Sequence, residues 1–246
     1  MKDHYSILNQ ISAELVLDAA TGRGDFIHVL KQNLRSYVQI IGVDASDKMV
    51  DFAQRSFPEN DVEIYQMDLE ALNYEDASFD LVCLSNSLHH IRDLDAVMQE
   101  LLRVLKPGGT LLINEMYCDG EQSEPQKTHI LMHHWLAAID SRGGTFHQST
   151  YPRQKIMDMV KKLRLQKLKV DDFYEPVDNP KDARNCASLQ RNLAETLKRV
   201  ETMPDNEELL AEGMAILERI NTVGCASPSR LLILGVKPAP KTKGEK

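Results

Sequence analysis

The chain contains 246 residues, 42% of them hydrophobic and 27% charged, a composition typical of a globular protein with a substantial core. Its net charge of -8 argues against nucleic acid as a partner, because proteins that bind the phosphate backbone carry excess Lys and Arg. It has no apolar run of the roughly 20 residues that a membrane-spanning helix needs, and no apolar signal core at its start. The four cysteines form no CxxC pair, which argues against a zinc knuckle or a disulfide framework and favours the cytoplasm.

The first half of the chain alternates apolar runs with helical patterns. Runs typical of strands buried on both faces occupy residues 14–19, 38–43, 61–67, 79–85 and 109–115. Helical patterns lie between them at residues 24–34, 46–56 and 93–105. This alternation predicts parallel strands joined by helical crossovers, and therefore an α/β fold with a Rossmann-like, doubly wound sheet.

The second half is richer in helical patterns. Helices are predicted at residues 124–141, 152–164, 181–201 and 205–222, and two further strands at 165–174 and 229–236. The sheet is thus expected to contain seven mostly parallel strands. We expect residues 1–116 to form the cofactor-binding half and residues 117–237 the rest of the sheet with helical insertions. Residues 238–246 are expected to form a disordered tail.

The most informative segment runs from Val16 to Phe26, where an apolar run ends at an acid and a glycine-containing loop leads into a helix. Such a helix N-terminus favours a bound anionic group. Gly22 and Gly24 allow the backbone to approach a ligand closely. Asp44 closes the next strand, a position from which a carboxylate can accept both ribose hydroxyls of a nucleotide.

Together with Met67-Asp68-Leu69, the strand at 78–82 that leads into 86–91, and the turn at 103–111, this loop resembles the class I S-adenosylmethionine-dependent methyltransferases. The resemblance covers residues 14–116, with Ala20 where the family usually has its first glycine. It implies S-adenosylmethionine as cofactor and in-line methyl transfer to a small or medium organic acceptor. The residues expected to bind the cofactor are Asp18, Ala20, Thr21, Gly22, Gly24, Asp44, Ala45, Met49, Asp68, Leu69 and Ser85.

Ligands of parallel sheets bind beyond the carboxyl ends of the strands. We therefore expect the insertions at about 117–150 and 176–225 to cap the cofactor pocket, with a dimerisation element or a helical layer as the alternative. Side chains expected in the substrate pocket are Tyr117, His133, His134 and Trp135. Three arginines could hold a substrate carboxylate if they face the cleft, namely Arg142, Arg153 and Arg184.

Methyl transfer from a sulfonium requires an aligned acceptor lone pair and exclusion of water, and it needs no nucleophilic triad. His89 and His90 are the candidates for proton transfer, because imidazole titrates near neutral pH. We expect no metal. His129 and His133 share a helix face, but no third ligand nearby in the sequence completes a metal site.

Other functions stay open at this stage. An NAD-dependent oxidoreductase would use Asp44 in the same way, although the loop lacks the third glycine of a dinucleotide fingerprint. A non-catalytic protein could bind S-adenosylmethionine as a ligand or sensor. A minor alternative is an arsenite methyltransferase with Cys118, Cys186 and Cys225 as thiolate ligands. We expect a monomer or homodimer that acts on a small-molecule substrate, with no nucleic acid partner and no membrane span.

Overall fold

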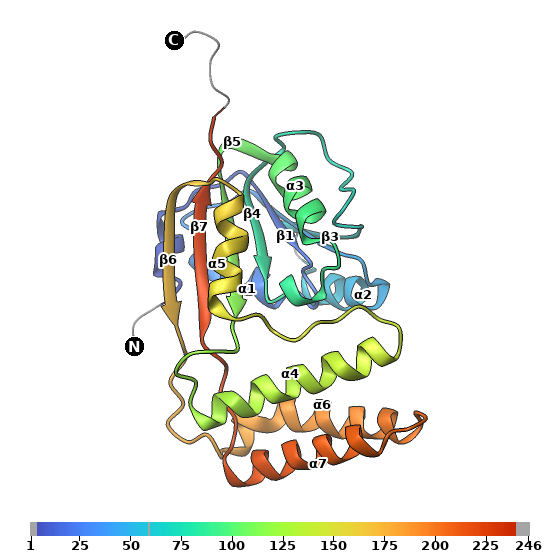
Figure 1. Cartoon of the computed structure of the whole chain (residues 1–246). Coiled ribbons are helices and arrows are strands. Elements are labelled where there is room, and N and C mark those ends of the chain that lie inside the picture. The colour runs from blue at the N-terminus through green and yellow to red at the C-terminus, as the bar shows by residue number, and fades with distance from the viewer. Residues whose placement is uncertain (1–3, 59, 240–246) are drawn as a thin grey trace.

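The computed structural model describes residues 4–58 and 60–239 and contains a central sheet of seven strands flanked by helices (Figure 1). The strand order is β3-β2-β1-β4-β5-β7-β6. Neighbouring strands are parallel except at β7, which runs antiparallel to both β5 and β6. The strands are β1 (Leu15–Ala19), β2 (Gln39–Asp44), β3 (Val62–Gln66), β4 (Phe79–Ser85), β5 (Leu105–Met116), β6 (Gln166–Phe173) and β7 (Arg230–Val236). The predicted Rossmann-like α/β fold is confirmed.

The helices also begin and end close to the predicted residues. They are α1 (Asp25–Asn33), α2 (Asp47–Ser56), α3 (Leu94–Val104), α4 (Glu124–Arg142), α5 (Arg153–Lys162), α6 (Ala183–Glu201) and α7 (Glu207–Thr222). Two short 3-10 helices are η1 (Ser6–Gln10) and η2 (Leu88–His90). Within the described residues, no helix is both long enough and apolar enough to cross a membrane.

The apolar strands are explained by helices on both faces of the sheet. Successive residues of a strand point to opposite faces. In β1, Leu17 packs into a cluster that contains residues of α3 and α5, whereas Val16 packs with residues of α1 and α2. Both side chains are fully buried. This two-sided burial leaves the ends of the strands as the places where polar side chains can gather.

Helices α4, α6 and α7 form a separate layer across the carboxyl ends of the parallel strands (Figure 1). They share their own buried cluster, at the centre of which Trp135 of α4 is 2% exposed and donates its Nε1–H to the carbonyl of Leu209 at 2.8 Å. Gly213 of α7 lies against the same ring, since a Cβ there would stand 2.6 Å from Trp135 Cζ2. The helices of this layer therefore pack tightly on one another.

One disulfide joins Cys186 to Cys225, so the sequence-based argument against disulfides is wrong for this pair. Gly224 adopts a φ of +92° against the carbonyl of Pro180, which places Cys225 beside the first turn of α6. The two cysteines lie 39 residues apart, a spacing that matches no local motif. Two of the three cysteines that an arsenite methyltransferase would use as ligands are thus bonded to each other. The cysteines also give no support for a reducing compartment, and the cytoplasmic location stays a prediction.

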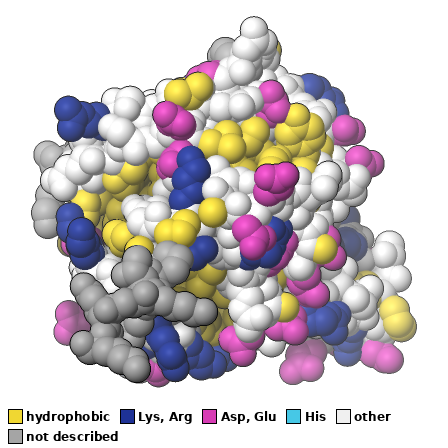
Figure 2. Space-filling view, turned by 90° about the horizontal axis from the view of Figure 1, so that it is seen from above, with side chains coloured by type: hydrophobic (Ala, Val, Ile, Leu, Met, Phe, Trp, Pro, Cys, Tyr) yellow, Lys and Arg dark blue, Asp and Glu magenta, His cyan; other side chains and the backbone are white. Residues whose placement is uncertain are grey.

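Acidic and basic side chains are interspersed at the amino end of the parallel strands, the face seen from above in Figure 2. Hydrophobic side chains form small groups between them. The net charge of -8 is therefore not gathered into one patch on this face. Most of the predicted disordered tail, residues 240–246, lies outside the described residues.

Candidate functional site

A cavity of about 720 Å³ opens at the carboxyl ends of β1, β2 and β4. All of the residues predicted to bind the cofactor line this cavity except Gly24. They are Asp18, Ala20, Thr21, Gly22, Asp44, Ala45, Met49, Asp68, Leu69 and Ser85. The fold thus brings together side chains from four separate loops that the sequence had placed at strand ends.

The loop between β1 and α1 shows why small residues are needed there. Among the described residues, no atom lies within 4 Å of the position that a Cβ on Gly22 would take, so this backbone faces open space in the cavity. Gly24 is different, because a Cβ there would stand 2.3 Å from the Phe57 ring. Ala20 has a φ of +53°, a left-handed conformation that costs a non-glycine residue about 1–2 kcal/mol. The alanine keeps the backbone shape that a glycine would adopt without strain.

Asp18 is a buried acid at the end of β1. It is 1% exposed and accepts a hydrogen bond of 2.6 Å from the Thr21 hydroxyl. The pKa of Asp18 is raised to about 7, mainly by burial; the Thr21 hydrogen bond lowers it, and the nearby Asp44 carboxylate adds to the increase. A positively charged ligand group beside Asp18 would favour the ionised carboxylate.

Asp44 ties the loop to the start of α2. Its Oδ2 accepts the backbone N–H of Gly22 at 2.8 Å, and its Oδ1 accepts that of Ser46 at 2.9 Å. Each carboxylate oxygen can accept a second hydrogen bond, so the side chain still has capacity for ligand hydroxyls. Asp68 similarly accepts the Glu70 N–H at 2.9 Å and caps a local turn. Both acids therefore combine a structural contact with a place on the cavity wall.

The other end of the cavity is lined by residues that the sequence analysis missed. Ile91 and Arg92 follow η2, whereas Thr145 and Phe146 come from the loop after α4. The Arg92 guanidinium lies 4.9 Å from the centre of the Phe146 ring. The rule that sites form after strand ends could have indicated residues 86–92, but Thr145 and Phe146 carry no sequence signal.

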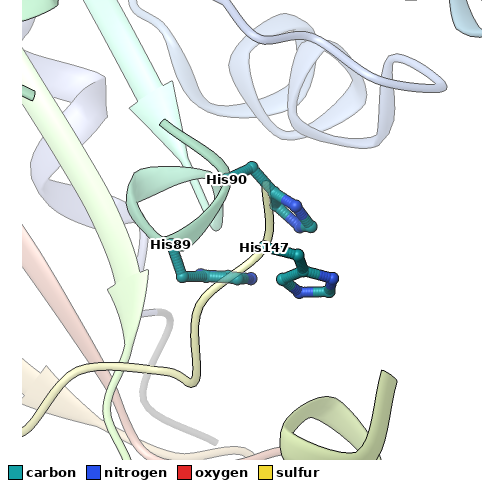
Figure 3. Close-up of side chains that lie close together, drawn as sticks. All are labelled: His89, His90 and His147. Carbon is teal, nitrogen blue, oxygen red and sulfur yellow. The ribbon is translucent and has the colours of Figure 1, made fainter. Parts of the chain in front are cut away.

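Three histidines converge beside this end of the cavity (Figure 3). His89 and His90 lie on η2, and His147 comes from the loop after α4. One ring nitrogen of each lies within 4.8 Å of the others. Desolvation lowers the pKa of His90 and of His147, so both rings are uncharged at neutral pH. His90 lines the cavity, whereas the buried His89 does not.

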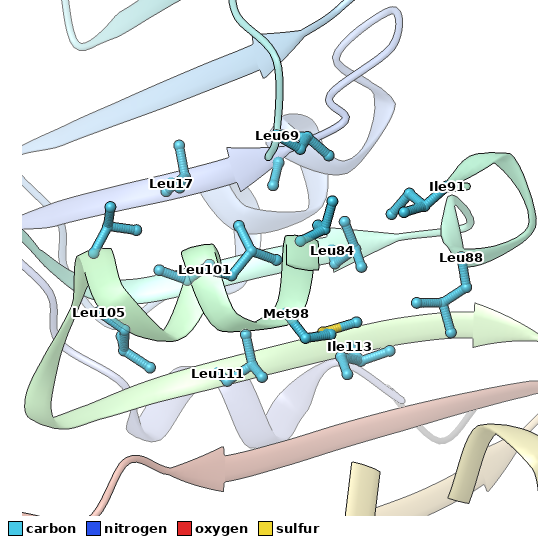
Figure 4. Packing of buried hydrophobic residues seen from close by; sticks show 14 of the residues in the cluster. Leu17, Leu69, Leu84, Leu88, Ile91, Met98, Leu101, Leu105, Leu111 and Ile113 are labelled. Atoms are coloured by element: carbon cyan, nitrogen blue, oxygen red, sulfur yellow. The ribbon is translucent and has the colours of Figure 1, made fainter. Parts of the chain in front are cut away.

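Glu115 fixes the segment that carries two of these rings. It is 1% exposed, and its Oε2 accepts the N–H groups of Ser87 at 2.9 Å and Leu88 at 3.1 Å. Its Oε1 lies 3.2 Å from Nδ1 of His89. Leu88 and Ile91 pack into the same buried cluster as residues of β4 and α3 (Figure 4). Hydrogen bonds and packing together hold η2 in place.

The predicted substrate-pocket residues do not line the large cavity. Trp135 belongs to the helical layer, and His134 Nε2 lies 3.0 Å from the Thr150 hydroxyl. Tyr117 continues from β5, where its N–H donates to the Ser229 carbonyl. His133 lines a second cavity of about 420 Å³, whose walls include residues of α4 and α6. These predictions were wrong for the large cavity because α4 packs against α6 and α7.

The three arginines proposed for a substrate carboxylate bind other groups. Arg142 donates to the Asp205 carbonyl at 2.7 Å, and Arg153 forms two 2.7 Å bonds with Asp172. Arg184 pairs with Asp182 on the surface. The arginines that line the large cavity are instead Arg23 and Arg92.

The two insertions contribute unequally to the site. Of residues 117–150, Thr145 and Phe146 line the large cavity, whereas residues of the 176–225 insertion line the second cavity. The 176–225 insertion also packs against α4 through α6 and α7. Its relation to the cofactor cavity is therefore indirect, through α4 and the loop that follows it.

Comparison with known proteins identifies the domain. Residues 17–113 match the family model described as a methyltransferase domain. A demethylmenaquinone methyltransferase of Lactobacillus johnsonii is 31% identical over 46% of this chain and 48% of its own length. One from Thermotoga maritima is 26% identical over 69% of this chain and 73% of its own length. The chain spans about half the length, or less, of several curated relatives that it matches.

Solved structures share the fold. The YcgJ protein of Bacillus subtilis has a TM-score of 0.60 and 19% identity, with 96% of this chain and 100% of that chain covered. Phosphoethanolamine N-methyltransferase 2 of Haemonchus contortus, in complex with phosphomonomethylethanolamine and S-adenosylhomocysteine, has a TM-score of 0.54 and 21% identity. Here 93% of this chain and 49% of that chain are covered. Residues 17–113 therefore match a methyltransferase domain, as the motifs predicted, and the solved structures share its fold.

Proposed function

We propose that this chain, through its S-adenosylmethionine-dependent methyltransferase domain, methylates a small or medium organic acceptor in the 720 Å³ cavity. One observation carries this proposal: a single cavity joins the loops after β1, β2 and β3 to a second set of residues, which includes Arg92 and Phe146. Its volume lies within the range of about 300–1,000 Å³ that small-molecule sites occupy. Cofactor and acceptor can therefore lie side by side in it.

The chemistry of the loops fits the cofactor. S-adenosylmethionine supplies a methyl group on a positively charged sulfur and also carries an ammonium and a ribose. The Asp44 carboxylate would accept the ribose hydroxyls while holding the Gly22 amide. Asp68 and the Leu69 amide would face the adenine, and Asp18 would favour the cationic amino-acid end. Open space at Gly22 leaves room for close approach of the ligand to the backbone.

The acceptor end favours a molecule with an apolar or planar body and an anionic or hydroxyl substituent. Ile91 and Phe146 supply apolar surface, and Arg92 supplies positive charge. The name shared by several relatives, demethylmenaquinone methyltransferase, agrees with a ring-containing acceptor. We therefore place hydroxylated aromatic compounds first among acceptors.

This chain's residues act mainly by binding, orienting and excluding water, because the cofactor supplies the electrophile. Of the two histidines predicted for proton transfer, His90 borders the cavity. His89 faces Glu115 and is a positioning residue for η2. The loop after α4 lines the same cavity through Thr145 and Phe146, at the end proposed for the acceptor.

Calorimetric titration with S-adenosylhomocysteine and with NADH tests the proposal. We expect S-adenosylhomocysteine to bind and NADH to give no heat. Asp44→Ala should weaken S-adenosylhomocysteine binding by about 1–3 kcal/mol, because ligand hydroxyls lose their acceptor. Binding of NADH alone would support the oxidoreductase alternative. Tight S-adenosylhomocysteine binding without turnover across a panel of hydroxylated aromatic acceptors would support a non-catalytic binding protein.

A further inference from the structure

We propose that His89, His90 and His147 form a binding site for one zinc ion beside the large cavity. The three rings come from η2 and from the loop after α4, two segments that are distant in the sequence (Figure 3). One nitrogen from each ring lies within 4.8 Å of the others. Three convergent imidazoles are the ligand set of zinc sites that keep a fourth position open.

Carboxylates orient the two buried rings. Nδ1 of His89 lies 3.2 Å from Glu115, and Nδ1 of His147 lies 2.8 Å from Asp140. A carboxylate at Nδ1 fixes the proton there and leaves the lone pair on Nε2, which is the arrangement that supports metal-bound histidines. Both of the buried rings therefore have a carboxylate at Nδ1.

The carboxylates contact Nδ1 of each ring, so Nε2 of each ring stays available as a metal ligand. Nε2 of His89 and Nε2 of His147 are buried and have no hydrogen-bond partner among the described residues. Burial of a polar nitrogen without a partner is unfavourable. A metal ion between the rings would satisfy both nitrogens at once, which ordinary core packing of the rings does not.

Zinc is the metal that suits this ligand set. Its bonds to imidazole are about 2.0–2.1 Å long, so a tetrahedral ion would hold the three nitrogens about 3.4 Å apart. His90 belongs to the exposed class as a residue, and its ring would move to close the remaining distance, while carboxylates hold His89 and His147. The charge of the ion would be offset by the Glu115 carboxylate, whereas Asp140 already pairs with Arg199, whose Nη2 lies 2.5 Å from its other oxygen.

The ion would adjoin the acceptor, because His90 lines the same cavity as Ile91 and Arg92. Its open position would take an oxygen of the acceptor, and zinc favours the deprotonated form of an oxygen ligand. His90 would then act as a ligand and not as a base. Zinc at these side chains would replace the expected metal-free site. Binding of the ion depends on the three histidines alone, whereas its contact with the acceptor rests on the proposed function.

Zinc binding by the metal-depleted protein provides the test. We expect titration with zinc chloride to show one ion per chain, and cobalt(II) to give the visible absorption of a tetrahedral nitrogen site. His147→Ala and His90→Ala should lose this binding. His134→Gln is the matched control, since His134 contacts Thr150 outside the cluster, and it should bind zinc like the wild type.

Asp140→Asn tests the orienting carboxylate without removing a ligand. Zinc affinity should fall about 10–100-fold in this variant, with an unchanged circular dichroism spectrum. His90→Ala alters an exposed ring, so it reports on binding even if a buried-ring variant fails to fold. Absence of stoichiometric zinc in the wild type would overturn the inference. So would unchanged affinity in both His90→Ala and Asp140→Asn. S-adenosylhomocysteine binding, measured on the same zinc-free sample, reports separately on the proposed function.

Discussion

Replacing Asp18 by asparagine is expected to stabilise the fold while weakening cofactor binding. The carboxyl is buried at the end of β1, and desolvation raises its pKa from 3.8 to about 7. Asparagine has the same shape and can still accept the Thr21 hydroxyl, but it never becomes charged. The variant therefore removes the cost of a buried charge.

The magnitude follows from proton linkage. Because the folded chain holds the proton more tightly than the unfolded chain, this carboxyl makes stability fall as the pH rises from about 4 through 7. Each tenfold change in the acid dissociation constant is worth about 1.4 kcal/mol. The increase in pKa from 3.8 to about 7 therefore lowers the free energy of unfolding by about 4 kcal/mol above pH 7. At pH 5 the same linkage lowers the free energy of unfolding by about 1.5 kcal/mol.

Urea denaturation of the ligand-free protein at pH 5 and pH 8 measures this effect. The advantage of Asp18→Asn over the wild type should grow by about 3 kcal/mol between these two values. S-adenosylhomocysteine should bind the wild type about tenfold more tightly at pH 8 than at pH 6, since the ionised fraction of Asp18 rises. Asp18→Asn should bind weakly at both values.

Asp44→Asn is the matched control, because it makes the same carboxylate-to-amide change in the same cavity. Asp44 accepts two backbone N–H groups, one on each oxygen. An amide can accept only one of them, so this variant should be less stable than the wild type by about 1–3 kcal/mol. Equal pH dependence of stability in the wild type and Asp18→Asn would refute the reasoning about Asp18.

Three further changes probe the fold around the site. Ala20→Gly should raise the unfolding free energy by up to about 1 kcal/mol, because glycine adopts the φ of +53° without strain; a loss of stability would contradict this. Cys186→Ala should lower the free energy of unfolding by about 2–4 kcal/mol, since the disulfide closes a loop between cysteines 39 residues apart. Unchanged stability under oxidising conditions would argue against the bond. Gly213→Ala should cost about 1–2 kcal/mol, because its Cβ would stand 2.6 Å from Trp135; Met214→Ala on the exposed face is the control.

Much of the cofactor half could be predicted because its signals are local. Strands buried on both faces are continuous apolar runs, and the residues that follow them must meet at one edge of a parallel sheet. Asp18, Asp44 and Asp68 come to the same cavity for this reason. Gly24 was predicted to bind the cofactor, but it packs against Phe57. A glycine in the sequence does not show whether a cofactor or a side chain approaches its backbone.

Residues 117–237 were less predictable, because their contacts join segments that are far apart in the sequence. Trp135 was expected in the substrate pocket. It is instead buried against α7, which lies about 75 residues further along the chain. His147 lacks any sequence motif, and it joins His89 and His90 through the path of the loop after α4. The Cys186–Cys225 pair depends in the same way on how the insertion folds back on itself.

The most direct test of the proposed function is a crystal structure of the protein with S-adenosylhomocysteine. The ribose hydroxyls should lie within hydrogen-bonding distance of the Asp44 carboxylate, with the adenine beside Asp68 and Leu69. The sulfur should face the end of the cavity lined by His90 and Phe146. A ligand bound outside this cavity, or with its sulfur turned away from that end, would contradict the proposed methyl transfer.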